Sequence, residues 1–130
     1  MKILIILLIL FFSNYVFGEV YYCVEDAATG FDGGNNYKQE NFSESKFTAD
    51  IDFEKLSFTS EKIMIQTRLD GHICSKDFEN ELMQCINSWG FTFIINIKNL
   101  KFVHSAGLGH VLDEKNSDDL LISYGQCSLF

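Results

Sequence analysis

The 130-residue sequence contains no proline, one tryptophan and a single arginine, Arg68. Binding to a phosphate backbone requires clustered lysine and arginine. The scarcity of arginine, together with 18 acidic residues and a net charge of −8, therefore argues against nucleic acid as a partner. The same acidic excess argues against binding to anionic membranes, whereas it permits a cationic partner without requiring one.

The first 18 residues have the layout of a signal peptide, so we predict export. A single lysine precedes an apolar run over residues 3–12, which is too short to span a bilayer. Val16 and Gly18 are small enough for a signal peptidase site, and we place cleavage after Gly18. The signal peptide would then be residues 1–18, and one domain would cover 19–130 with no membrane span. The expected location is periplasmic or secreted.

No two cysteines have CxxC spacing, which argues against a zinc site. The four cysteines are Cys23, Cys74, Cys85 and Cys127, and an even number in a small exported chain predicts two disulfides. Three pairings are possible. We favour Cys23–Cys127, which would join the terminal strands, and Cys74–Cys85, which would close a local hairpin.

Alternation of apolar and polar residues is the main structural signal, and it is clearest over residues 91–105. Apolar side chains recur at every second position on both sides of a polar turn at Lys98-Asn99. This is the pattern of a β-hairpin with one buried face. Single strands are expected over residues 19–25, 37–42 and 120–130. A second hairpin is expected over residues 46–59, with its turn at Glu54-Lys55. A third is expected to join strands over 63–69 and 72–74 through an Asp70-Gly71 turn.

The remaining stretches are less regular. Residues 75–83 fit either a short helix capped by Ser75 or a turn followed by a strand, and we favour the second because strands flank them. Residues 26–45, apart from the short strand, and 106–119 are expected to be loops. Gly125, inside a predicted strand, indicates a bulge or a close backbone approach where a barrel closes.

Local hairpins in series without a long helix predict an all-β fold. We expect a single small antiparallel meander that forms a closed or partly closed β-barrel of about eight strands, because closure removes exposed sheet edges. A β-sandwich is the alternative. A barrel lumen would offer room for a small apolar ligand, but in so short a chain side chains are expected to fill it.

Candidate chemistry is sparse. His72, His104 and His110, with Asp113 or Glu114 nearby, contain metal-ligating side chains, but no regular element sets their spacing. Ser105 and Ser123 have no G-x-S-x-G context, and the cysteines are expected to be oxidised. We therefore assign no catalytic, metal or cofactor-binding residue.

Two local motifs have simple explanations. Residues 32–36, DGGNN, are rich in oxygen ligands but lack the spacing of a calcium loop, so turn formation explains them better. Asn41-Phe42-Ser43 has the form of a glycosylation sequon, which matters only in a eukaryotic host.

Both ends of the predicted domain resemble a group of small exported bacterial proteins of unknown function. The similar residues are Tyr22-Cys23, Thr29-Gly30-Phe31 and the closing Gly125-x-Cys127-x-x-Phe130. The resemblance implies a periplasmic location and supports the terminal cysteine pairing, but it implies no activity or site residue. Periplasmic lysozyme inhibitors are also small disulfide-linked barrels, but their Ser-Gly-x-x-Tyr and Trp-x-Lys-Gly signatures are absent, so that similarity is one of fold only.

The expected function is therefore binding or interaction, without catalysis. One alternative is inhibition of a cationic secreted protein such as a lysozyme, which would make association sensitive to salt. A hydrolytic enzyme that uses the loop histidines His104 and His110 is another alternative. A structural envelope component is a third.

Overall fold

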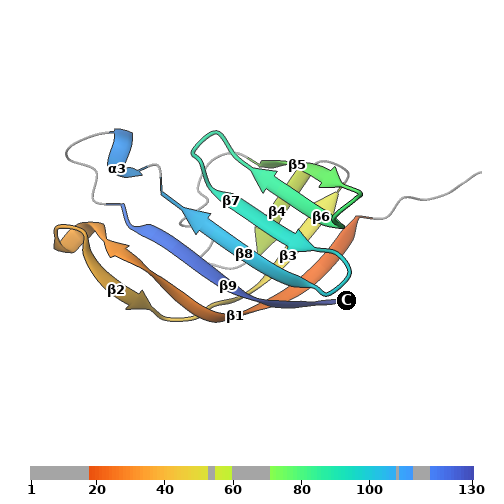
Figure 1. The fold of residues 1–130 in the computed structure, drawn as a ribbon, viewed down its shortest axis with the longest axis horizontal. Helices are drawn as coiled ribbons and strands as arrows, with labels where there is room; N and C mark the ends of the chain where they lie inside the picture. The colour runs from red at the N-terminus through yellow and green to blue at the C-terminus, as the bar shows by residue number, and fades with distance from the viewer. Residues whose placement is uncertain (1–17, 53–54, 60–70, 108, 113–117) are drawn as a thin grey trace, which may run out of the picture.

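The computed structural model describes residues 18–52, 55–59, 71–107, 109–112 and 118–130, and strands make up most of these residues (Figure 1). A 3-10 turn, η1 (Gly33–Asn35), and a short helix, α3 (Gly109–Leu112), lie between strands. The strands are β1 (Glu19–Asp32), β2 (Lys38–Phe42), β3 (Lys46–Asp52), β4 (Lys55–Thr59), β5 (His72–Asp77), β6 (Leu82–Ile86), β7 (Thr92–Asn96), β8 (Lys101–Ala106) and β9 (Leu120–Leu129).

The described strands form one antiparallel sheet that closes on itself. From β3 to β9, each strand pairs with the next one along the chain. β1 pairs with β3 on one side and with β9 on the other, which completes an eight-stranded barrel. β2 is an additional strand that pairs with the second half of β1. The prediction of an all-β meander closed into a barrel is confirmed, and the β-sandwich alternative is wrong.

Alternation along the strands directs one set of side chains into the barrel. Phe47, Phe93 and Phe102 meet there, with ring centroids 5.4 to 6.2 Å apart. These rings fill the lumen at their level, as expected for a small barrel. The main buried cluster consists of Tyr21, Cys23, Phe47, Ala49, Ile51, Leu56, Cys74, Met83, Cys85, Phe93, Ile95, Phe102 and Cys127.

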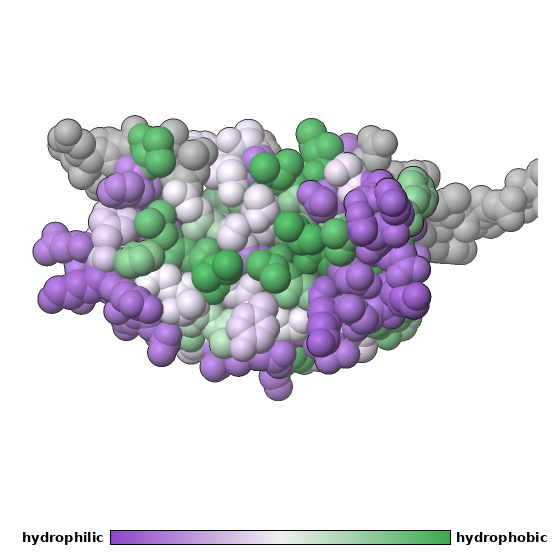
Figure 2. Space-filling model, in the orientation of Figure 1, coloured by the Kyte–Doolittle hydropathy of each residue, from purple (hydrophilic) through white to green (hydrophobic). Residues whose placement is uncertain are grey.

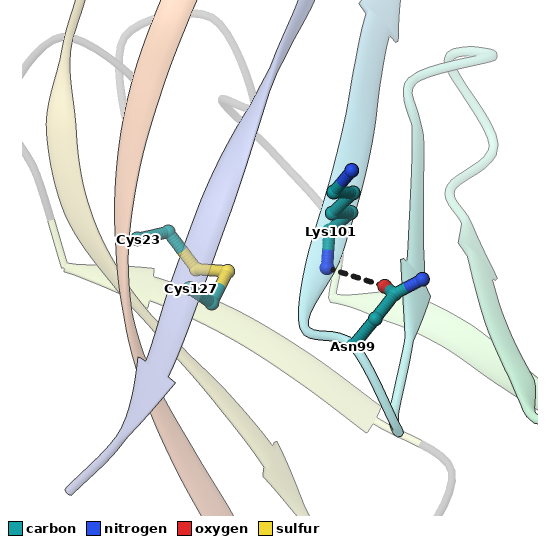
Figure 3. The surroundings of a disulfide bond; sticks show 4 residues. All are labelled: Cys23, Asn99, Lys101 and Cys127. Carbon is teal, nitrogen blue, oxygen red and sulfur yellow. Dashed lines mark hydrogen bonds between the residues drawn. A yellow bond between two sulfur atoms is a disulfide. The ribbon is translucent and has the colours of Figure 1, made fainter.

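Both disulfides join directly opposed residues on neighbouring strands. Cys23 on β1 faces Cys127 on β9 (Figure 3), and Cys74 on β5 faces Cys85 on β6. The Cα atoms of each pair lie 3.9 Å apart. The predicted pairing is therefore confirmed, and one bridge closes the barrel while the other strengthens a hairpin.

A β-bulge in β1 changes which residues point inward. The register with β9 shifts between Glu25 and Ala27, so that Glu25 is buried and the next buried residue is Ala28. Gly125 lies opposite Glu25, and a Cβ there would sit 2.0 Å from the Val24 carbonyl oxygen. The close approach predicted for Gly125 at the barrel closure is confirmed.

Asn and Asp side chains shape three successive turns. Asp77 accepts hydrogen bonds from the amides of Glu79 and Asn80, and Asn96 accepts them from Lys98 and Asn99. Between these turns, Asn87 accepts hydrogen bonds from the amides of Trp89 and Phe91, both at 3.0 Å. Such local bonds replace the ladder bonds that end with each strand.

The structure corrects three sequence-based boundaries. β1 continues to Asp32, although residues 26–32 were expected to be loop, because β9 and β2 supply ladder partners on both sides. Lys55 pairs with Asp52 in the ladder and does not belong to the turn. The helix alternative for residues 75–83 is wrong, because β5 runs through Ser75 and a turn precedes β6.

Some predictions lie outside the described residues. These are the signal peptide over residues 1–18, of which only Gly18 is described, the turn residue Glu54, the strand over 63–69 with its turn residue Asp70, and the contribution of Asp113 or Glu114 to a metal site.

Candidate functional site

Four polar residues lie in the barrel interior beside the aromatic cluster, and one of them, His104, is directly opposite Phe93 in the β7–β8 ladder. Glu25, His72, His104 and Ser123 all point inward, and each is at most 5 % exposed. Each lies two residues from an inward apolar or glycine position on its own strand, so the strand alternation carries it inside. We call these four residues the interior polar layer.

Glu25 holds the barrel wall together at the bulge. Its carboxylate accepts a hydrogen bond of 2.6 Å from the Ser45 amide, and its own amide donates to the Ser45 carbonyl at 3.0 Å. Ser45 ends the short link between β2 and β3. Because a buried carboxylate requires hydrogen-bond donors, this reciprocal pair explains how an acidic residue lies inside the barrel.

His72 and His104 enter the layer from β5 and β8. Burial lowers the pKa of His72 from 6.5 to about 4. Burial also lowers the pKa of His104 to about 4, with an additional contribution from the electrostatic effect of His72. Both imidazoles are therefore neutral at pH 7, and they lie close enough to influence each other.

The geometry of the layer does not favour nucleophilic catalysis. Ser123 lies directly opposite His104 in the β8–β9 ladder, so the two side chains share the interior. However, the Ser123 hydroxyl makes no hydrogen bond within the described residues. A serine nucleophile needs a hydrogen-bonded base and access to substrate, and these buried side chains provide neither.

The other predicted candidates lie apart from this layer. His110 is exposed on α3, where its ring packs against Tyr37 with centroids 4.4 Å apart. Ser105 points outward. Within the described ranges, no three His, Cys, Asp or Glu side chains gather as a metal site would require. Asp32, in the oxygen-rich loop, caps η1 by accepting from the Gly34 amide at 2.8 Å.

A second feature lies on the outer surface of β6–β9. Two rows of outward-pointing residues cross these four strands, and neither row contains a charged side chain. We call these eight residues the neutral face. They are Ile86, Thr92, Ser105 and Ile122 in the first row, and Gln84, Ile94, Val103 and Tyr124 in the second.

Four of the five apolar members of the neutral face are exposed, and the fifth, Ile94, is half-buried. Ile86, Ile122 and Tyr124 retain 54 %, 52 % and 56 % of their accessible surface, and Val103 retains 40 %. Figure 2 shows apolar side chains gathered across the middle of the face that β7, β8 and β9 present, with hydrophilic side chains towards its ends. Single exposed apolar residues are ordinary, but a contiguous group indicates an interaction surface.

Hydrogen bonding reduces the polarity of this face further. The hydroxyls of Thr92 and Ser105 are directly opposed on β7 and β8 and bond to each other at 2.6 Å. On β1, which borders the first row, the Thr29 hydroxyl donates to the Glu40 carbonyl at 3.1 Å. These groups need fewer water partners, so the surface costs less to dehydrate than its composition suggests.

Sequence reasoning missed both features as groups. Parity along one strand does not show which residues of different strands lie side by side. The register across β6–β9 was needed to align Val103 with Tyr124 and Ser105 with Ile122. For the interior layer, the available signal was polar residues at inward positions, such as Glu25 after Tyr21 and Cys23.

Comparison with known proteins adds no identity: no protein-family model, curated protein or solved structure matches this chain. Within the part of the chain that the structure describes, no helix has the length and apolar character needed to cross a membrane.

Proposed function

We propose that this chain is an exported, disulfide-linked β-barrel protein that acts by binding another protein and not by catalysis. The observation that carries the proposal is that reactive and apolar side chains lie in different places. His72, His104 and Ser123 are enclosed in the barrel, whereas the neutral face presents exposed apolar groups to the outside. Apolar surface in the centre of a patch, with polar residues around it, is typical of protein interfaces.

A periplasmic or secreted location is part of the proposal. Two disulfides are expected in an oxidising compartment outside the cytosol. The resemblance of the terminal motifs to small exported bacterial proteins agrees with such a location, as does the expected signal peptide.

Site-specific cross-linking tests the binding function. A photo-reactive phenylalanine analogue in place of Val103 on the neutral face is expected to give a discrete cross-linked protein when the folded chain is irradiated among the exported proteins of its host. The same analogue in place of Ser57, which is exposed on β4, serves as the matched control and is expected to give none. Absence of a product at Val103, or equal products at both positions, contradicts the proposal.

A cationic partner such as a lysozyme is the second candidate, and the distribution of charge gives it less support. On β2 and β3, the exposed acidic residues Glu40 and Asp50 share their strands with the exposed lysines Lys38 and Lys46. Binding through the neutral face should change little between about 0.05 and 0.5 M salt, whereas charge-driven binding should weaken steeply. Measuring the yield of cross-linked product as a function of salt concentration distinguishes the two kinds of binding.

A further inference from the structure

We propose that the neutral face binds a second copy of this chain, giving a dimer with two-fold symmetry. This inference rests on the proposed binding function and names its partner. In such a dimer the same surface of each copy contacts its equivalent, so the surface must be self-complementary. Apolar, uncharged surface satisfies this condition because identical side chains can meet without repulsion.

The distribution of charge over the molecule supports a second copy of the chain as the partner. The chain has a net charge of −8, so two copies repel each other unless they meet where charge is absent. The two rows of the neutral face provide such a region across four adjacent strands. By contrast, the exposed side chains of β2, β3 and β4 include Lys38, Glu40, Lys46, Asp50 and Lys55.

The chemistry of the neutral face also disfavours a strongly charged partner. A cationic or anionic surface placed on it would lose hydration without gaining an opposite charge. Ile86, Ile94, Val103 and Ile122 are β-branched side chains that stand on neighbouring strands, and such side chains interdigitate when two sheets pack face to face about 10 Å apart. A second neutral face has the matching composition.

The size of the face sets the expected affinity. Four strands about 4.8 Å apart place the axes of the two outer strands about 14 Å from each other. Eight residues form the centre of an interface, whereas a standard interface has roughly 20–30 residues on each side. Lys101 and Gln126 face each other two residues beyond Val103 and Tyr124 on β8 and β9, so they would lie at the rim. We therefore expect a dissociation constant on the order of 1–100 µM, weaker than that of an obligate dimer.

Sedimentation velocity of the oxidised protein over about 1–500 µM tests the dimer. The wild type should shift from monomer to dimer as its concentration increases. Ile122→Lys places a charge on the face, at the β9 end of its first row, and should raise the dissociation constant at least tenfold. Ser57→Lys adds the same charge at an exposed position on β4 and should dimerise like the wild type.

The outcomes separate the dimer from the broader function. A monomer at every concentration, or a dimer that Ile122→Lys leaves intact, overturns the dimer. Circular dichroism and the intact mass establish that each variant is folded and oxidised, and Val103→Lys provides a second substitution on the same face. If the analogue at Val103 cross-links a different protein while the chain stays monomeric, the dimer fails and the binding function remains. If it cross-links nothing, both fail.

Discussion

At the residue scale, the unusual groups are the two neutral histidines inside the barrel. His72 and His104 are 2 % and 1 % exposed, and burial lowers the pKa of each to about 4. In the unfolded chain the pKa of each histidine returns to a value near 6.5. Between pH 6.5 and pH 4 the unfolded chain therefore binds more protons than the folded one, and stability decreases as the pH falls through this window.

We expect acid to destabilise the protein through these two residues. The free energy of unfolding should be highest above about pH 6.5, and by pH 4.5 each histidine should reduce it by about 2–3 kcal/mol. His72→Leu removes one titrating group, so the loss between pH 7.5 and pH 4.5 should be smaller by about that amount. Urea unfolding of wild type and variant at both pH values measures the difference. If the free energy of unfolding of wild type and variant fell equally between the two pH values, His72 would not take up a proton on unfolding.

At the element scale, the contact between β1 and β9 depends on backbone atoms that approach closely. A Cβ on Gly30 would lie 1.8 Å from the Leu120 carbonyl oxygen, and one on Gly125 would lie 2.0 Å from that of Val24. Backbone atoms in a ladder cannot move aside as a flexible side chain can. The bulge at Glu25 and these glycines therefore allow the strong local twist by which the barrel closes.

Gly125→Ala is expected to lower the free energy of unfolding by at least about 2 kcal/mol, because the added methyl group collides with the β1 backbone. Gly71→Ala is the matched control, since a Cβ there meets no atom within 4 Å. Chemical denaturation of both variants gives the comparison. Equal stability of Gly125→Ala and Gly71→Ala would mean that the two strands are further apart than described.

The turns between β5 and β8 were only partly predictable from local sequence. Asn and Asp favour turns because their side chains accept hydrogen bonds from nearby amides, as those of Asp77, Asn87 and Asn96 do. The sequences of these turns did not show that Glu81 and Leu100 adopt positive φ angles of 56° and 59°. Leu100 packs against the main buried cluster, so tertiary contacts offset the cost of its conformation.

At the scale of the whole molecule, two disulfides constrain very different lengths of chain. Cys23–Cys127 closes a loop with a sequence separation of 104, whereas the separation of Cys74–Cys85 is 11. The long bridge joins the first and last strands of the barrel (Figure 3), and the short one joins the β5–β6 hairpin. In the chain-entropy account, the longer loop restricts the unfolded state more.

Replacing each pair by alanine should therefore have unequal effects. Removal of Cys23–Cys127 should cost about 4–5 kcal/mol of stability, and removal of Cys74–Cys85 about 3 kcal/mol. Urea unfolding of the two double variants, with the remaining bridge verified by mass after alkylation without reductant, measures both values. A larger loss from the Cys74–Cys85 pair would show that native packing around that bridge outweighs chain entropy.

The sequence by itself determined the strand alternation, the all-β class and which side chains of most strands face inward, because these depend on a two-residue period that is local in the chain. It also indicated two disulfides, since four cysteines in a predicted exported chain favour oxidation. Their pairing was favoured on the expected position of the strands, and the fold confirmed it.

Only the tertiary structure decided which side chains of different strands become neighbours. β1 continues past the bulge at Glu25 to Asp32, the β8–β9 ladder places His104 opposite Ser123, and the register of β6–β9 aligns the neutral face. Register is set by pairing between segments distant in sequence, and a shift of one residue would reverse the face of every side chain in a strand. The candidate sites therefore arise from long-range geometry that no local pattern contains.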